Sequence, residues 1–511
     1  MKKILLFGAG KSATFLINYL LDHAVKENWE LIVVDANAEL AISKTSHSTA
    51  GRGISFDINH SLERGEYISR SDLVISLLPP TLHYLVAQDC ITYGKNLLTA
   101  SYVDENIASL GSQLAGKEIL FLCEMGLDPG IDHMSAMRLI DGIRDQGGKI
   151  ISFKSHCGGL VAPESDDNPW HYKISWNPRN IVLAGKAGAV FKENGVEKKL
   201  NYEEVFASER LIEIENIGFL SWYPNRDSLS YAPLYGLEDA DTFVRSTLRH
   251  PDFLYGWKNV IDLKLTDETP RYETDGKVLS DFFKEHLDKN GFSDWLQQKL
   301  MERFSQTKSL LENLMNLMEA EQVVLKEGEE IPENLMMVDK KGQLEDVTMD
   351  EIKNTAAGVV AHKMHEANLT LKQLFYLGMD DDQTKINKGF CSSADVLQLA
   401  LEKKLPLQEH DHDMVVMLHE VEYVVGTRKS EVKSSMVIKG EDGVRTAMAK
   451  TVGLPLGIAA KLILNGQIKL TGLHIPTKKI IYEPVMTELE ANGIRFHEEI
   501  SEGQQTIGNG Q

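Results

Sequence analysis

The first part of the chain alternates short apolar runs with segments of helical spacing. Residues 3–7 form an apolar run that ends at Gly8, and residues 12–22 follow with apolar side chains on one helical face. Short apolar strands that alternate with helices are typical of a parallel sheet with right-handed helical crossovers. The pattern therefore predicts an α/β domain at the start of the chain. Its further strands are expected at 30–34, 72–78, 96–100 and 118–122.

The pattern changes after about residue 148. Strand-like stretches rich in Gly, Pro, Trp and Tyr continue to about residue 265, which predicts a mixed α+β domain. Residues 278–325 and 349–405 contain good helix formers and predict a helical domain. The polar, acidic stretch 326–348 between them is expected to be a loop.

The last part of the chain predicts two further elements. Residues 414–438 are strand-like and favour a hairpin around Gly426. Residues 443–465 have helical spacing, and Pro455 is well placed as the first residue of a second helix, where its missing N–H has no partner to lose.

The composition disfavours several classes of protein. The chain has 511 residues, too many for one hydrophobic core, so several domains are expected. Its net charge of -21 repels phosphate backbones, and we expect no nucleic-acid partner. No stretch approaches about 18 consecutive apolar residues, so no membrane span is expected. The 4 cysteines form no CxxC pair, which disfavours a disulfide framework or a zinc site and suits a reducing cytoplasm.

A glycine-rich motif of the form GxGxxA lies between the first strand and the first helix. Gly8 permits the tight turn, Gly10 lets the backbone approach a pyrophosphate, and Ala13 lets helix and strand pack closely. The start of the helix, at Lys11 and Ser12, presents unpaired N–H groups to the phosphates. In this context the motif predicts a Rossmann-type dinucleotide-binding domain; an ordinary glycine turn is the alternative.

Asp35 ends the second strand and predicts the type of dinucleotide. A carboxylate here accepts hydrogen bonds from the adenosine ribose hydroxyls and repels a 2′-phosphate. No arginine follows in Ala36, Asn37 or Ala38 to neutralise that phosphate. We therefore expect NAD as the cofactor, with NADP as the second possibility. The alternative role for Asp35 is only to cap the strand.

The carboxyl ends of the other strands are expected to line the sugar and the nicotinamide, because dinucleotides bind along that edge of a parallel sheet. The candidates are Asp57, Ile58, Leu78, Ala100 and Ser101. For Asp57 the alternative is a simple turn residue.

Several short strings, in a fixed order, carry a resemblance to a known family. Residues 126–133 read Gly-Leu-Asp-Pro-Gly-Ile-Asp-His, and residues 157–164 read Cys-Gly-Gly-Leu-Val-Ala-Pro-Glu. The ordered set resembles the glutamate-forming saccharopine dehydrogenase family, also called saccharopine reductase. The other strings lie at 76–79, 101–103, 172–179, 224–228 and 245–249.

This resemblance implies a reaction and three domains. The family oxidises L-saccharopine with a nicotinamide dinucleotide and water to L-glutamate and 2-aminoadipate 6-semialdehyde, reversibly, in lysine metabolism. We also expect a homodimer in the cytoplasm. The implied domains are a Rossmann domain at 1–128 completed by about 440–500, a substrate-binding and dimerisation domain at 129–280 with about 406–440, and a helical domain at 281–405.

Asp128 and Cys157 are the candidate residues for proton transfer. Asp128 followed by Pro129 has the pattern of a helix start, with Asp at the N-cap and Pro at N1. Capping alone is one interpretation; the other is that its second oxygen binds the substrate amine. The resemblance implies contacts of Asp128 with substrate and cofactor, and of Leu127 and Pro129 with the cofactor. Cys157 is expected near the reaction centre, with plain packing as the alternative, and an ordered water network is a third candidate.

Arginine side chains are the expected anchors of the substrate. Saccharopine carries three carboxylates, which guanidinium groups bind bidentately. Arg226 and Arg249 lie in the family-like strings and are predicted carboxylate clamps; surface ion pairs are the alternative. Arg245 is a third candidate, for which a structural salt bridge is an equal alternative. The resemblance also places Thr247 and Leu248 against the substrate.

Three further residues are assigned by the resemblance. It places Ser101 and Tyr102 at the substrate and the cofactor, at the end of a strand that points toward the nicotinamide. Tyr102 either hydrogen-bonds a carboxylate or packs. Asn177 matches a cofactor-side position at which the family often has Ser.

No metal site is expected, because His410 and His412 lie in a hydrophilic turn and no further ligand is placed by spacing. Two other functions stay open. One is an imine reductase of the carboxynorspermidine or homospermidine synthase kind, and the other is a non-catalytic NAD-binding sensor. The arginine pair favours a ligand with several carboxylates, and the intact strings favour an enzyme.

Overall fold

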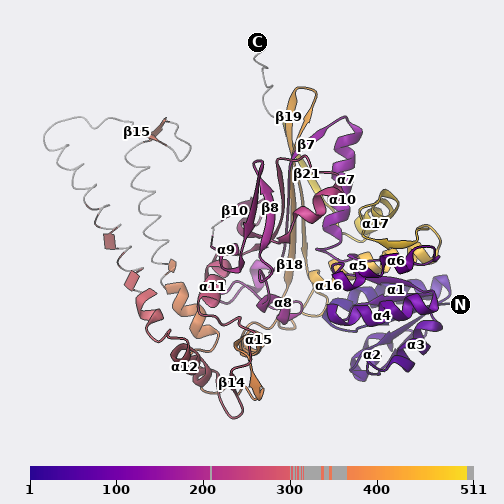
Figure 1. Cartoon of the computed structure of the whole chain (residues 1–511), viewed down its shortest axis with the longest axis horizontal. Helices are drawn as coiled ribbons and strands as arrows, with labels where there is room; N and C mark the ends of the chain where they lie inside the picture. The colour runs from indigo at the N-terminus through magenta and orange to yellow at the C-terminus, as the bar shows by residue number, and fades with distance from the viewer. Residues whose placement is uncertain are drawn as a thin grey trace. The chain divides into compact units, whose positions relative to one another are not determined.

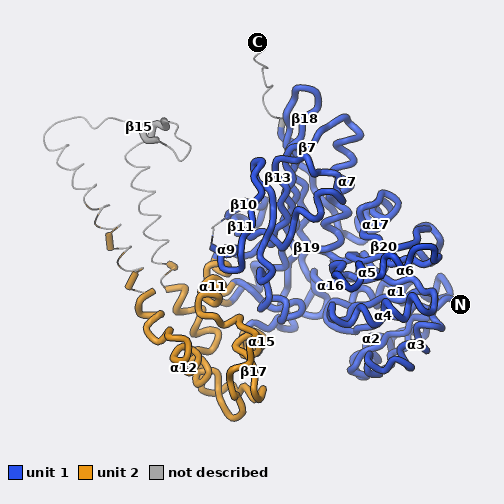
Figure 2. The backbone as a smooth tube through the Cα atoms, in the orientation of Figure 1, with its two compact units in different colours: residues 1–167, 171–251, 405–511 blue, residues 168–170, 252–404 orange. Residues whose placement is uncertain are grey.

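The computed structural model describes residues 1–207, 210–299 and 368–502 continuously, together with scattered residues between 300 and 367. The chain divides into two compact units, shown in blue and orange in Figure 2. The three-domain division implied by the resemblance is finer than these two units and stays a prediction. Unit 1 consists of 1–167, 171–251 and 405–511, and unit 2 of 168–170 and 252–404.

Unit 1 contains a seven-stranded sheet in the order β20-β6-β5-β4-β1-β2-β3, with every neighbouring pair parallel. The apolar runs of the N-terminal part form its strands, which confirms the predicted Rossmann-type sheet. The pattern missed β3 because its Gly-Arg-Gly-Ile sequence has only one strongly apolar residue. Gly53 is needed there, since a Cβ would lie 2.4 Å from the Ala41 carbonyl carbon. The strands are β1 Lys2–Phe7, β2 Trp29–Val34, β3 Gly51–Ile54, β4 Leu73–Ser76, β5 Asn96–Thr99, β6 Leu120–Leu122 and β20 Gly472–His474.

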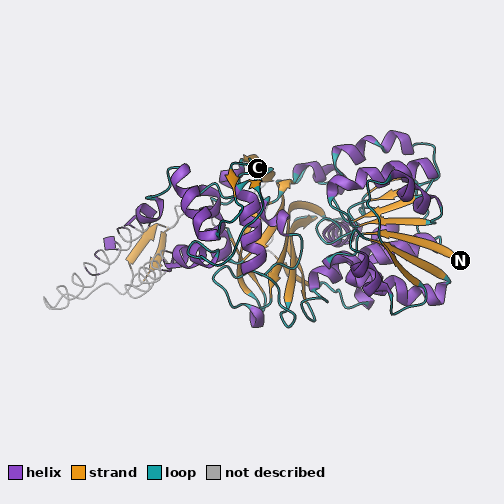
Figure 3. Ribbon diagram, turned by 90° about the horizontal axis from the view of Figure 1, so that it is seen from below, coloured by secondary structure: helices purple, strands orange, loops and turns teal. Residues whose placement is uncertain are grey.

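Helices cover both faces of this sheet (Figure 3). Alternate side chains of β1 point to opposite faces, so Ile4 and Leu6 belong to one apolar core and Leu5 and Phe7 to another. The helices around the sheet are α1 Thr14–Glu27, α2 Ala38–Thr45, α3 Ser61–Ser69, α4 Pro80–Tyr93, α5 Glu105–Ser109, α6 Gly111–Leu114, α16 Ala447–Leu464 and α17 Lys479–Ala491.

A second sheet of ten strands completes unit 1 and confirms the predicted mixed α+β region. β7 lies in its middle, parallel to β13 and antiparallel to β18 (Figure 1). β18 and β19 form the predicted hairpin, which turns at Gly426 with a φ of +62°. Helix α7 (Ile131–Asp145) packs on this sheet through β7 and β18. The strands are β7 Lys149–Val161, β8 Ala189–Glu193, β9 Val196–Leu200, β10 Leu211–Ile214, β11 Gly218–Pro224, β12 Arg226–Asp227, β13 Thr242–Arg249, β18 Asp413–Val425, β19 Arg428–Lys439 and β21 His497–Glu502, and the short helices are α8 Pro178–Val182, α9 Tyr202–Val205 and α10 Ala232–Tyr235.

Helix α16 is a buried helix of 18 residues that packs on α1 and α17. Pro455 lies inside it, so the predicted second helix beginning at Pro455 is wrong; tertiary packing stabilises the helix across the missing N–H. Gly453 and Gly457 allow the close approach to α1, because Cβ atoms there would lie 2.8 Å from the Leu16 nitrogen and 2.7 Å from the Tyr19 ring. Among the described residues α16 alone is long and apolar enough to cross a membrane, yet 72% of it is buried in the protein, as in a core helix.

Unit 2 is mainly helical in its described part, as the sequence predicts. The predicted loop 326–348 is corrected in part, because β15 (Leu335–Val338) and β16 (Leu344–Val347) pair there as an antiparallel hairpin. The other elements of the described part are α11 Pro251–Asp262, α12 Leu279–Lys289, α15 Ser393–Lys404, and the strands β14 Tyr272–Glu273 and β17 Phe390–Cys391.

Replacing Gly453 by Ala should destabilise unit 1, because the added Cβ meets the backbone of α1. We expect the free energy of unfolding to fall by about 1–3 kcal/mol, measured as a lower midpoint of thermal unfolding. Gly142→Ala in α7 is the matched control: nothing lies within 4 Å of its added Cβ, so the midpoint should stay or rise slightly. Equal midpoints for both variants would contradict the close helix contact.

Candidate active site

The glycine-rich turn after β1 has the shape that the sequence predicts. Gly8 has a φ of +102°, and a Cβ on it would lie 2.8 Å from the Leu77 carbonyl oxygen. Gly10 is exposed, with open space where a Cβ would point. Lys11 and Ser12 form a 3-10 turn that leads into α1. Backbone N–H groups and open space at a helix start fit the pyrophosphate of a dinucleotide.

Asp35 connects the end of β2 to this turn. Its Oδ2 accepts a hydrogen bond from the Ala9 N–H at 2.7 Å, and its Oδ1 accepts one from the Asn37 N–H at 2.9 Å. Lys44 donates to the Gly10 carbonyl oxygen at 2.8 Å. Burial lowers the pKa of Lys44 to about 8, although the charge of Asp35 opposes that change. Asp35 therefore holds the turn in place and is still partly exposed beside the expected ribose position.

The other candidates at the strand ends differ in their surroundings. Asp57 is exposed and accepts hydrogen bonds from the Asn59 backbone and side chain, which lower its pKa, so it forms the turn that was its alternative role. Ile58 and Leu78 are partly buried against one apolar core, and Ala100 against the other. Their cofactor contacts stay predictions.

The loop that contains Asp128 differs from the expected helix start. The Asp128–Pro129 peptide bond is cis, and α7 begins at Ile131 with Gly130 as its N-cap. The Gly130 N–H donates to Asp132 Oδ1 at 2.6 Å. The prediction that Asp128 caps the helix is therefore wrong, because the helix begins two residues later, with Gly130 as its N-cap. Leu127 and Pro129 are buried beside it, and their cofactor contacts stay predictions.

Asp128 belongs instead to a hydrogen-bonded group that we name the Arg245 cluster, formed by Tyr102, Asp128, Asp132 and Arg245. The Tyr102 hydroxyl donates to Asp128 Oδ1 at 2.8 Å. Arg245 Nη2 donates to that same oxygen and to Asp132 Oδ2, both at 2.7 Å. Arg245 and Asp132 are buried, whereas the Asp128 side chain keeps 14% of its surface exposed. Asp128 is thus the carboxylate of the cluster that a ligand can reach.

A shell of polar and aromatic side chains supports the Arg245 cluster. His133 is fully buried and bonds with Glu124 at 2.8 Å and with the Tyr235 hydroxyl at 2.5 Å. Tyr231 donates to Glu124, and its ring lies 4.3 Å from the Arg245 guanidinium carbon. These contacts fix the rings around the guanidinium and give both ring nitrogens of His133 a hydrogen-bond partner.

The two carboxylates of the cluster have different affinities for a proton. Burial raises the pKa of Asp128, and the neighbouring Asp132 raises it further against the opposing effect of Arg245. Burial also acts to raise the pKa of Asp132, but His133, Arg245 and the Gly130 N–H together lower it. Asp128 is therefore the better carboxylate for proton exchange with a ligand.

Cys157 lies on β7, opposite Thr247 of β13. Burial raises the pKa of its thiol, and the carboxylates of Asp128 and Asp132 raise it further. The thiol therefore stays protonated near neutral pH, which does not suit a general base. Leu248 is fully buried, so a contact with a ligand there would use its main chain, whereas Thr247 is partly exposed.

The three arginines have different places in the structure. Exposed Arg226 lies with its guanidinium carbon 5.2 Å from the centre of the Tyr102 ring, which puts it beside the cluster. Buried Arg249 donates to the Leu248 carbonyl oxygen at 2.7 Å. Arg245, a third candidate in the sequence, forms the buried salt bridge that was its alternative role. Carboxylate binding by Arg226 and Arg249 stays a prediction.

Asn177 is the N-cap of α8, where its side chain accepts a hydrogen bond from the Arg179 N–H at 3.0 Å. This local role explains the residue without a cofactor, and its cofactor contact stays a prediction.

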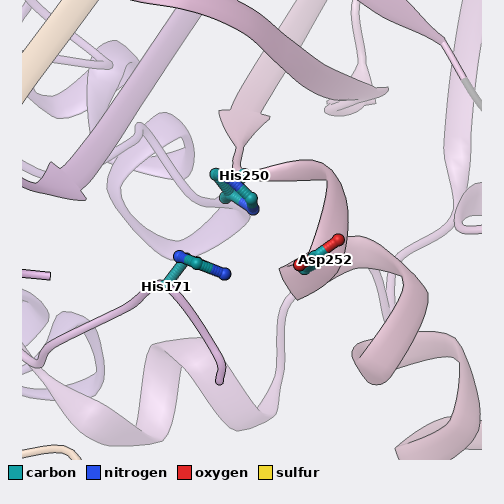
Figure 4. A group of neighbouring side chains, drawn as sticks. All are labelled: His171, His250 and Asp252. Carbon is teal, nitrogen blue, oxygen red and sulfur yellow. The ribbon is translucent and has the colours of Figure 1, made fainter. Parts of the chain in front are cut away.

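Some acidic and histidine side chains gather outside the Arg245 cluster. Figure 4 shows His171, His250 and Asp252. The two histidines belong to unit 1 and their rings stack with centres 3.9 Å apart, whereas Asp252 belongs to unit 2. Exposed Glu215, His497 and Glu499 form a second group. Exposed acidic groups commonly gather without a metal ion, so the group of Glu215, His497 and Glu499 does not alter the assignment of the site.

Three residues around Asp128 were assigned no role from the sequence: Asp132, Glu124 and Tyr231. Asp132 lies in the quoted string 126–133, so a signal for it was present. Glu124 and Tyr231 lie outside every quoted string, and only folding brings them within 3.2 Å of each other.

Comparison with known proteins identifies relatives of the whole chain. The family model of the saccharopine dehydrogenase NADP binding domain matches residues 4–122, and that of the saccharopine dehydrogenase C-terminal domain matches residues 126–494. A saccharopine dehydrogenase [NADP(+), L-glutamate-forming] of Pyricularia oryzae is 30% identical over 98% of this chain and 99% of its own length.

An alpha-aminoadipic semialdehyde synthase of Arabidopsis thaliana is 32% identical over 87% of this chain, which spans 38% of that longer protein. The structure of apo saccharopine dehydrogenase (L-Glu forming) from Saccharomyces cerevisiae superposes with a TM-score of 0.76. Its sequence is 26% identical, and the match covers 98% of this chain and 100% of the yeast chain.

Replacing Arg245 by Met should destabilise the protein strongly, because it leaves Asp128 and Asp132 without their shared cation. We expect a loss of about 3–5 kcal/mol in the free energy of unfolding, measured by chemical denaturation. Arg138→Met is the matched control, since the Arg138 ion pairs with Glu483 and Glu490 are partly exposed and should contribute less than about 1 kcal/mol. Similar losses of stability in both variants would show that the buried ion pairs of Arg245 contribute no more than the partly exposed ion pairs of Arg138.

Proposed function

The chain belongs to the saccharopine dehydrogenase family, and we propose that it oxidises L-saccharopine with a nicotinamide dinucleotide and water to L-glutamate and 2-aminoadipate 6-semialdehyde. The reaction is reversible and belongs to lysine metabolism. The observation that carries this proposal is the contact of Tyr102 and Arg245 with a partly exposed Asp128, at the carboxyl ends of β5 and β6. That edge of the sheet is where the nicotinamide of a dinucleotide binds in Rossmann domains.

The proposed chemistry has three steps on the substrate. A nicotinamide dinucleotide, which the turn at Gly8 and Gly10 and the carboxylate of Asp35 would hold, would supply the acceptor for a hydride from the carbon next to the secondary amine of the substrate; loss of that hydride turns the amine into an imine. Water adds to the imine, and the resulting carbinolamine collapses to the aldehyde and the amine of glutamate. The net change consumes one water and releases one proton beside the reduced cofactor.

Asp128 supplies the proton exchange in this scheme. Its carboxylate takes the proton that the substrate amine must lose before hydride transfer, and its raised pKa suits that exchange better than the lowered pKa of Asp132. Tyr102 and Arg245 hold the carboxylate in one orientation. The Cys157 thiol stays protonated in this scheme and does not act as a base.

Arg226 is the proposed clamp for a substrate carboxylate. It is exposed and its guanidinium lies over the ring of Tyr102, the residue that donates to Asp128. Arg249 with Thr247 and the main chain of Leu248 is the second proposed contact, on the strand β13 that also carries Arg245. Ser101, next to Tyr102, follows β5 at the same edge of the sheet.

We also propose NAD as the preferred dinucleotide. The names of the Pyricularia and Saccharomyces cerevisiae relatives specify NADP(+), and the N-terminal family model is described as an NADP binding domain. Against that general preference, the carboxylate of Asp35 would lie beside a 2′-phosphate and repel it. Lys44, the cation that acts on Asp35, already donates to Gly10.

The homodimer, the cytoplasmic location and the absence of nucleic-acid and membrane partners stay predictions from the sequence. They are independent of the chemistry proposed for the Arg245 cluster.

The purified protein should reduce NAD when L-saccharopine is added, as followed by absorbance of the reduced cofactor. Arg226→Ala should raise the KM for saccharopine about tenfold or more, because a charge-assisted hydrogen bond contributes about 1.5–3 kcal/mol, and should leave the KM for NAD unchanged. Arg70→Ala, which removes an exposed ion pair with Glu66, is the matched control. No reduction of NAD or NADP by the wild type would refute the proposed function.

The wild type should have a higher kcat/KM for NAD than for NADP, and Asp35→Asn should narrow that ratio by removing the charge that repels the 2′-phosphate. Asp22→Asn, at an exposed acid of α1, is the control and should leave the ratio unchanged. A wild type that prefers NADP would show that Asp35 does not set the specificity.

A further inference from the structure

One buried histidine beside the Rossmann sheet bonds to two serines, one through each of its ring nitrogens. His83 lies on α4 and is 3% exposed. Its Nδ1 is 2.8 Å from the hydroxyl oxygen of Ser76, the last residue of β4, and its Nε2 is 2.8 Å from the hydroxyl oxygen of Ser101, which follows β5. A polar chain therefore runs from the interior of the sheet to the edge that carries the site.

The imidazole of His83 is uncharged at working pH. Burial lowers its pKa to about 4, against a smaller opposing effect of Asp104. A neutral imidazole has one N–H and one lone pair, so it donates one of its two hydrogen bonds and accepts the other. One serine hydroxyl therefore donates to the imidazole and the other accepts from it.

Ser101 is placed to transmit this orientation to a ligand. It precedes Tyr102, whose hydroxyl donates to Asp128, and its carbonyl oxygen accepts a hydrogen bond from the Glu124 N–H at 3.2 Å. Ser101 is partly exposed, whereas Ser76 is fully buried. A ligand can thus reach only the Ser101 end of the chain.

We propose that His83 is a positioning residue that orients the Ser101 hydroxyl to donate to a carboxylate oxygen of the substrate. The Ser76 hydroxyl donates to Nδ1, and the Nε2–H donates to the Ser101 oxygen, which leaves the Ser101 proton to point toward the site. The donors then follow one direction, and each hydrogen bond polarises the next. This inference rests on the proposed function, because it takes saccharopine as the ligand that accepts the bond.

The first test compares saccharopine kinetics of His83→Leu, Ser101→Ala and the double variant. His83→Leu should raise the KM for saccharopine about fivefold to tenfold with kcat nearly unchanged, since a bond to a carboxylate exists equally in ground and transition states. The double variant should be no worse than Ser101→Ala, because His83 acts only through Ser101. His83→Gln, whose amide can donate near the position of Nε2, should restore most of the KM.

A second pair of variants keeps the test valid if His83→Leu fails to fold. Ser76→Ala removes only one hydroxyl and should raise the saccharopine KM a few-fold, an effect that disappears in the Ser101→Ala background. Ser71→Ala is the matched control, since it removes an equally buried serine hydroxyl that bonds the Tyr67 carbonyl oxygen. It should leave both the saccharopine kinetics and the KM for NAD unchanged within about twofold.

The outcomes separate this inference from the proposed function. A wild type without activity on saccharopine overturns the proposed function and the inference with it. If the wild type is active, the inference alone is overturned by either of two results. One is that the Ser76 and His83 variants have the saccharopine KM of the wild type, and the other is that their effects simply add to that of Ser101→Ala.

Discussion

The site depends on one buried guanidinium that holds two carboxylates. Arg245 comes from β13 of the mixed sheet, whereas Asp128 and Asp132 lie in the loop after β6 and in α7. Charges in a low-dielectric interior need partners of opposite sign, so this contact fixes how the two sheets of unit 1 meet. It also holds Asp128 Oδ1, while 14% of the Asp128 side chain stays exposed.

The same contact explains why the site is surrounded by aromatic and hydroxyl groups. Tyr102 and Tyr231 lie against the Arg245 guanidinium with their ring centres 5.7 and 4.3 Å away, and His133 stacks on Tyr231. Such rings exclude water from the ion pairs and strengthen them, while their polar atoms satisfy neighbouring donors and acceptors. The proton affinity of Asp128 results from this arrangement: burial and Asp132 raise it, and Arg245 limits the increase.

The glycine-rich turn after β1 depends on fewer contacts than the Arg245 cluster. Gly10 has open space where a Cβ would point, Gly8 has no room for a Cβ, and Asp35 holds the turn through the Ala9 N–H. Because this carboxylate holds the turn through the Ala9 and Asn37 N–H groups, a change at Asp35 alters the geometry of the loop as well as its charge. The argument for NAD therefore rests on the charge of one residue of this chain, Asp35, whereas the description of the N-terminal family model specifies NADP.

The sequence by itself determined the parallel sheet, the glycine-rich turn, Asp35, the β18–β19 hairpin and the family, because these depend on local periodicity, local turn chemistry or ordered strings. It failed at β3, at the helix start after Asp128 and at Pro455, where close tertiary contacts outweigh local propensity. It also named Arg245 only as a third candidate, since its partners Asp128 and Asp132 are more than 100 positions away along the chain. Only the tertiary structure decided which arginine is buried between carboxylates and which carboxylate stays accessible, because burial and charge pairing are set by residues that local sequence does not bring together.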